Sequence, residues 1–129
     1  KKLEELLITG CKRLSFIVYS DMLNLCNLRY LQLRDCCSLE YLFTHCTAQT
    51  MISLEVLKVK DCRLLEYIVT FKGEDDIFST TVMFPKLREV SIAGCDVRYI
   101  GPASFAIGLS KLEILKIKDA PQLEYVFGE

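Results

Sequence analysis

The sequence has no tryptophan, only one histidine, and three prolines among its 129 residues. Because His45 is the single histidine, any Ser-His-Asp or Cys-His relay would have to rest on it alone. Two glycine-rich patterns that bind phosphates, Gly-x-x-x-x-Gly-Lys and Gly-x-Gly-x-x-Gly, do not occur in the chain. We therefore expect no enzyme activity, no catalytic residue and no cofactor within these residues.

The chain also lacks a charge imbalance and a long hydrophobic run. Lys and Arg number 16 and Asp and Glu number 17, so the net charge is −1 and nucleic acid is not an expected partner. A membrane-spanning helix needs about 18 or more consecutive apolar residues. The nearest run, Tyr41 to Leu54, is interrupted by polar residues, so we expect no membrane span. Hydrophobic residues nevertheless make up 51% of the chain, which predicts a folded domain.

Cysteine, in contrast, is abundant. The seven cysteines are an odd number, and the chain carries no signal-like apolar stretch at its start and no Asn-x-Ser/Thr glycosylation site. These features favour a reducing compartment over a secreted disulfide scaffold, so we expect a cytoplasmic protein. The first residue is Lys1 rather than Met, and we expect residues 1–129 to be one domain piece cut from a longer protein.

One pattern recurs five times: Leu-x-x-Leu-x-Leu-x-x-Cys-x-x-Leu-x-x-Leu-Phe, with conservative replacements. Three of the four spacings between copies fall within the roughly 20–29 residues typical of leucine-rich repeats. The remaining spacing is lengthened by an insertion over 71–85, whose glycine and acidic residues predict an exposed loop. The copies start near residues 3, 28, 54, 87 and 112.

Within each copy the Leu-x-Leu part alternates apolar and polar residues, which is typical of a short strand buried on one face. Equivalent strands of successive copies would stack in parallel, with irregular or short helical segments returning between them. The sequence therefore predicts an α/β fold, a leucine-rich-repeat solenoid of about five rungs with its strands on the concave face of a horseshoe fragment. The expected strands lie at 5–9, 30–34, 56–60, 89–93 and 114–118.

A cysteine follows the strand in four copies, and Ala120 takes its place in the fifth. A small side chain that tolerates apolar surroundings suits the corner where each rung leaves its strand. A metal or redox ladder is the alternative, but metal sites draw on close pairs such as Cys-x-x-Cys, and the chain has none. We expect a structural role and no metal site for this column, which consists of Cys11, Cys36, Cys62 and Cys95.

The exposed positions of the expected strands form the candidate binding surface, because repeat solenoids bind through their concave surface. Cations gather at the middle and last exposed positions, and aromatic or aliphatic side chains at the first. Such a surface suits an acidic protein partner. The alternative is that neighbouring carboxylates alternate with these cations and only keep the surface soluble. Asp35, Asp61 and Asp119 lie next to the cations, and Glu55 and Glu113 lie just before them. The predicted partner-binding residues are Tyr30, Gln32, Arg34, Val56, Lys58, Lys60, Ile114, Lys116 and Lys118.

Three phrases carry a family resemblance: "FPKLREVSIAGC" over 84–95, "LEVLKVKDCRLLEYIV" over 54–69 and "LEILKIKDAPQLEYVF" over 112–127. Over essentially its whole length, the chain resembles the C-terminal leucine-rich-repeat region of plant intracellular disease-resistance proteins of the nucleotide-binding, coiled-coil class. The resemblance implies a module of innate immunity that recognises pathogen effectors directly or through a guarded host protein. It also implies an autoinhibitory contact with the receptor's nucleotide-binding domain, which lies upstream and would hold the nucleotide.

Two other readings of the pattern remain. Cytoplasmic repeats with a cysteine column also resemble the substrate-recognition half of F-box adaptors of ubiquitin ligases, although the irregular spacing of the copies disfavours that class. A free-standing repeat scaffold is the second alternative.

Overall fold

The structure is a computed structural model that describes residues 4–10, 25–36, 38–70, 84–102 and 109–128. Strands dominate these ranges, and helix is confined to two short segments. In chain order the elements are β1 (Glu5–Thr9), the 3-10 helix η1 (Leu25–Asn27), β2 (Tyr30–Arg34), β3 (Tyr41–Thr44), α1 (His45–Thr50), β4 (Val56–Lys60), β5 (Tyr67–Thr70), β6 (Glu89–Ala93), β7 (Gly101–Pro102), β8 (Ile114–Lys118) and β9 (Phe127–Gly128).

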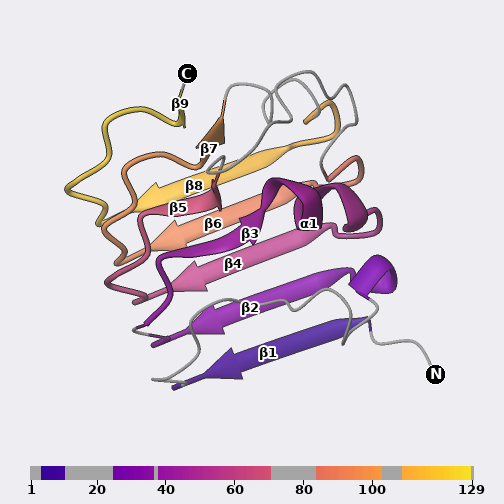
Figure 1. The fold of residues 1–129 in the computed structure, drawn as a ribbon, viewed down its shortest axis with the longest axis horizontal. Coiled ribbons are helices and arrows are strands. Elements are labelled where there is room, and N and C mark those ends of the chain that lie inside the picture. The colour runs from indigo at the N-terminus through magenta and orange to yellow at the C-terminus, as the bar shows by residue number, and fades with distance from the viewer. Residues whose placement is uncertain (1–3, 11–24, 37, 71–83, 103–108, 129) are drawn as a thin grey trace.

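Five of these strands form one parallel sheet in the order β1-β2-β4-β6-β8. Figure 1 shows them stacked from β1 at one end to β8 at the other. Equivalent residues of successive strands are in register: Leu7 lies opposite Gln32, Gln32 opposite Lys58, and Lys58 opposite Ser91. Their bounds confirm the five strands expected from the Leu-x-Leu pattern. Over the described residues the fold is α/β, with mostly parallel strands and few helices.

The alternation of side chains along these strands decides which face of the sheet is buried. Leu31, Leu57 and Val90 lie opposite one another on the inner face, where each is at most 2% exposed. Leu7 points to the opposite face and is 58% exposed. We call that outer side the open face of the sheet, because the core lies entirely behind the other side.

A second layer, made from the returning segments, covers the inner face (Figure 1). β3 pairs with β5 and β7 with β9, both in parallel, and α1 contacts β3 and β5. The helix agrees with the short helical returns that we expected, but the short strands do not. They form because buried amides need partners. The N–H groups of Ile68 and Val69, for example, both donate to the carbonyl oxygen of Ile100 at 2.9 Å.

Each strand of the main sheet is followed by a residue in the left-handed conformation. Glycine and aspartate tolerate this conformation better than most residues do. The amide of the turn residue still donates to the neighbouring strand; the N–H of Asp61, for example, bonds the carbonyl oxygen of Ala93 at 2.9 Å. The chain therefore turns without losing a backbone hydrogen bond. These residues have φ values of 50–72°: Gly10, Asp35, Asp61, Gly94 and Asp119.

The column cysteines lie just beyond these turns. Cys36, Cys62 and Cys95 are all 0% exposed. Each thiol donates to the carbonyl oxygen two residues before it, over 3.4–3.6 Å. This is the structural corner role that we expected. Cys11 and most of the insertion, residues 71–83, lie outside the described residues.

Candidate functional site

All nine predicted partner-binding residues lie on the open face. The strand register places equivalent residues of β2, β4 and β8 in three columns that run across the sheet: Tyr30, Val56 and Ile114; Gln32, Lys58 and Lys116; and Arg34, Lys60 and Lys118. Between β4 and β8, strand β6 contributes an acidic or small residue to each column, namely Glu89, Ser91 or Ala93.

Part of this surface is hollowed. A depression of about 210 Å³, which we call the lysine hollow, lies over β2, β4, β6 and β8. It forms because β6 carries the small side chains of Ser91 and Ala93 where β4 and β8 carry lysines. The predicted residues Tyr30, Val56 and Ile114 do not line it. Those that do are Gln32, Arg34, Lys58, Lys60, Lys116 and Lys118.

The cations around the hollow form no ion pair with the described residues. Within the part of the chain that the structure describes, ion pairs involve Arg29, Arg88 and Arg98, and none of the five cations on the open face. The ammonium of Lys58 lies 5.9 Å from the centre of the Tyr30 ring, which is a cation–π distance. The surface therefore offers several positive charges with apolar side chains beside them.

The neighbouring aspartates do not pair with these cations in the part of the chain that the structure describes. Asp35, Asp61 and Asp119 follow the strands in the left-handed conformation, which serves the turns. Among the described residues none of the three forms an ion pair with the cations of the hollow. Among the described residues, no contact on the open face therefore supports the alternative that these aspartates compensate the cations.

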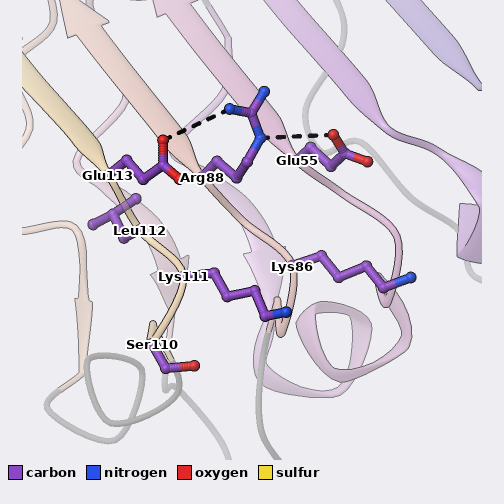
Figure 2. A pocket seen from close by; sticks show the side chains of 7 residues that line it. All are labelled: Glu55, Lys86, Arg88, Ser110, Lys111, Leu112 and Glu113. Atoms are coloured by element: carbon purple, nitrogen blue, oxygen red, sulfur yellow. Dashed lines mark ion pairs between the residues drawn. The ribbon is translucent and has the colours of Figure 1, made fainter.

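A row of alternating charges stands one residue before each strand of the main sheet, and we call it the charge ladder. It consists of Glu4, Arg29, Glu55, Arg88 and Glu113. Arg29 lies 3.9 Å from Glu4 and 3.1 Å from Glu55, and Arg88 lies 3.7 Å from Glu55 and 3.9 Å from Glu113. Figure 2 shows Arg88 between its two glutamates. From the sequence we identified only Glu55 and Glu113 of this row and missed the arginines between them, although the sign alternates at one fixed position before each Leu-x-Leu.

A pocket of about 400 Å³ lies beside the ladder, between the starts of β4, β6 and β8. Lys86 and Lys111 line it, and both are exposed. Figure 2 shows their side chains extending away from the ion-paired row in a similar direction. These two lysines match Lys116 of the open face in charge and exposure, whereas Lys58 is half-buried, and they lie outside the predicted surface.

A row of tyrosines lines the second layer. The rings of Tyr67 and Tyr99 are 4.9 Å apart between centres, and those of Tyr99 and Tyr125 are 5.6 Å apart. Burial and the neighbouring Tyr99 raise the pKa of Tyr67. Beside the row, Arg98 binds Glu124 at 2.9 Å. A Glu-Tyr or Arg-Tyr pair recurs near the end of the last four copies, and this was the sequence signal for the row.

The buried thiol of Cys62 is poorly suited to nucleophilic chemistry. Contact with the Cys95 thiol and burial raise the pKa of the Cys62 thiol, and the thiolate is the reactive form. The same contact lowers the pKa of the Cys95 thiol, which is itself fully buried. In the described ranges, no group of three or more His, Cys, Asp or Glu side chains is arranged to hold a metal ion.

No helix in the described ranges is both long enough and apolar enough to cross a membrane. Comparison of the chain with protein-family models, with curated proteins and with solved structures gave no match.

Proposed function

We propose that the chain is a leucine-rich-repeat solenoid fragment that binds an acidic surface of a partner protein through its open face. Five parallel strands in register, each built on one copy of the Leu-x-Leu pattern, support the solenoid assignment. The observation that carries the function is the lysine hollow, where four lysines from two strands flank small residues and form no ion pair with the described residues. Unpaired cations beside Tyr30 and Val56 favour electrostatic complementarity with an acidic partner.

The biological setting that we propose is that of a cytoplasmic plant immune receptor. In this setting the module senses a pathogen effector, directly or through a guarded host protein, and contacts the receptor's own nucleotide-binding domain in the resting state. The support is the resemblance of the phrases over 54–69, 84–95 and 112–127 to receptors of that class. The chain acts by binding and not by catalysis, and nucleotide belongs to a separate domain.

The receptor class is tested by sequencing the transcript that encodes the chain. We expect a Gly-x-x-x-x-Gly-Lys-Ser/Thr loop in frame, several hundred codons before Lys1. An F-box upstream would instead assign the repeats to a ubiquitin-ligase adaptor. A start codon directly before Lys1 would leave a free-standing scaffold, and either result would overturn the receptor assignment.

The binding surface is tested by selecting binders from a displayed library of acidic, aromatic-containing peptides. We expect the selected peptides to lose binding to the double variant Lys58→Glu, Lys116→Glu, because the reversal places carboxylates on both sides of Ser91. The matched control is Lys86→Glu, Lys111→Glu, which changes the net charge equally at the pocket beside the charge ladder. Equal loss in both double variants, or no selected binder at all, would count against the open face as the binding surface.

A further inference from the structure

The lysine hollow has positive charge on two opposite sides. Lys58 and Lys116 stand on either side of Ser91, and two residues along the strands another pair of lysines stands on either side of Ala93. Neighbouring strands lie about 4.8 Å apart, so the backbones of β4 and β8 are about 10 Å apart across β6. Two lysines on one face of a strand are separated by about 6.6 Å along it. The four lysines therefore surround a small area whose centre lies between Ser91 and Ala93.

Carboxylates limit the hollow at both of its ends. At the strand starts, Glu89 accepts a hydrogen bond from the Ser91 hydroxyl at 3.3 Å. Beyond the strand ends stand the turn residues Asp35, Asp61 and Asp119. None of these four carboxylates lines the hollow. A row of acidic groups laid along β6 would therefore meet like charges at both ends, whereas one compact anion at the centre would be surrounded by lysines and would avoid the carboxylates.

A phosphate group matches this arrangement better than a carboxylate does. A phosphorylated side chain carries a charge of about −1.5 to −2 on three oxygen atoms at neutral pH, so it can accept hydrogen bonds from several ammonium groups at once. The hollow also offers a neutral donor. The Oε1 atom of Gln32 accepts a hydrogen bond from the Tyr30 hydroxyl at 2.9 Å, which leaves the amide nitrogen to donate into the hollow.

The size of the hollow favours a single side chain as its occupant. Its volume is about 210 Å³, which is smaller than the roughly 300–1,000 Å³ of pockets that hold drug-sized ligands. A nucleic acid is a poorer occupant, because its successive phosphates would extend from the lysines toward Glu89 or the turn aspartates. One phosphate on one side chain therefore fits both the size and the charge of the hollow.

We propose that the lysine hollow binds one phosphorylated serine or threonine side chain of the partner protein, with the phosphate held over Ser91 and Ala93 between the lysines of β4 and β8. This inference rests on the proposed function, because it specifies the acidic group that the open face recognises. Binding then depends on whether the partner has been phosphorylated.

The test compares three fluorescein-labelled peptides that differ only at the centre of a glycine-alanine sequence, where they carry phosphoserine, two adjacent glutamates or serine. The first two peptides have nearly the same charge, but only phosphoserine concentrates it on one group. We expect the phosphoserine peptide to bind the 129-residue protein on the order of tenfold more tightly than the glutamate peptide, measured by fluorescence anisotropy at low salt. The serine peptide should not bind.

Two variants separate the shape of the hollow from its charge. Ala93→Tyr fills the hollow and leaves every charge in place, so the preference for phosphoserine should disappear while weak binding of the glutamate peptide remains. The double variant Lys58→Glu, Lys116→Glu should lose both peptides, and the matched control Lys86→Glu, Lys111→Glu should keep them. Circular dichroism of each variant establishes that it is folded.

Equal binding of the phosphoserine and glutamate peptides would overturn this inference and leave the proposed acidic partner standing. No binding of the phosphoserine peptide would also overturn it, and the peptides selected from the acidic library then decide whether the proposed function falls as well. Displacement of the phosphoserine peptide by equimolar inorganic phosphate would make a free anion the ligand. Tighter binding of a single-stranded RNA of equal length would make nucleic acid the partner, and either result would overturn the inference.

Discussion

Gly94 occupies one of the left-handed positions that end the strands, at a φ of 68°. A Cβ atom at this position would lie against the carboxylate oxygen Oδ1 of Asp61. Gly10 has a similar φ of 72°, but a Cβ atom there would meet nothing within 4 Å. The two glycines therefore separate the cost of the backbone conformation from that of the close approach.

We predict that Gly94→Ala lowers the free energy of unfolding by about 1–3 kcal/mol and more than Gly10→Ala does. Chemical denaturation of both variants measures the difference. Equal losses of the free energy of unfolding would mean that the Asp61 side chain moves aside at no cost and that only the left-handed backbone conformation matters.

Leu57 lies at the centre of the core, between Leu31 and Val90, and is fully buried. We predict that Leu57→Ala lowers the free energy of unfolding by about 2–5 kcal/mol, because it leaves a cavity in the core. Leu7→Ala is the control, since Leu7 is 58% exposed on the open face and its loss should cost little. Denaturant titrations measure the free energy of unfolding of both variants. Comparable losses would contradict the assignment of Leu57 to the inner face and Leu7 to the open face.

The thiols differ in accessibility. Cys36, Cys62 and Cys95 are buried, and Cys26 is partly exposed. We predict that maleimide labelling at pH 8, followed by peptide mass spectrometry, modifies Cys26 before Cys36, Cys62 and Cys95, which react only on unfolding. For Cys62 the raised pKa adds to burial, because a smaller fraction is thiolate at any given pH. Fast labelling of Cys62 in the folded protein would show that the corner is open.

At the scale of the element, β4 separates the residues that form the core from those that we propose to bind a partner. The inner residues of β4 are buried, but Lys58 points to the open face and is not part of the core. We predict that the double variant Lys58→Glu, Lys116→Glu changes the free energy of unfolding by less than about 1 kcal/mol. Thermal unfolding of this variant beside the wild type is the measurement, and a large loss would show that these lysines are structural.

The strands were also where the sequence was most informative. Alternation in the Leu-x-Leu segments predicted all five strands of the main sheet and the columns of the open face. The returning strands were missed because segments such as Ile68–Val69 are short apolar runs without a period, so their pairing depends on a neighbour far along the chain. The lysine hollow could not be predicted either, because it depends on small side chains of β6 standing between cations of β4 and β8.

At the scale of the molecule, charge is arranged by surface although the net charge is only −1. The lysines of the open face form no ion pair with the described residues, whereas oppositely charged residues pair along the strand starts. A composition count averages over these surfaces, so it gives no indication of the acidic partner that we propose. That proposal rests on the lysines that the described residues leave without an ion pair.

The most direct test of the central claim is nuclear magnetic resonance mapping of a selected acidic peptide on the isotope-labelled protein. We predict that the chemical-shift changes cluster on β2, β4, β6 and β8, with those of Lys58 and Lys116 among the largest and Tyr30 perturbed through its contact with Lys58. Changes centred on Lys86 and Lys111, or on the tyrosine row of the second layer, would contradict the claim that the open face is the recognition surface.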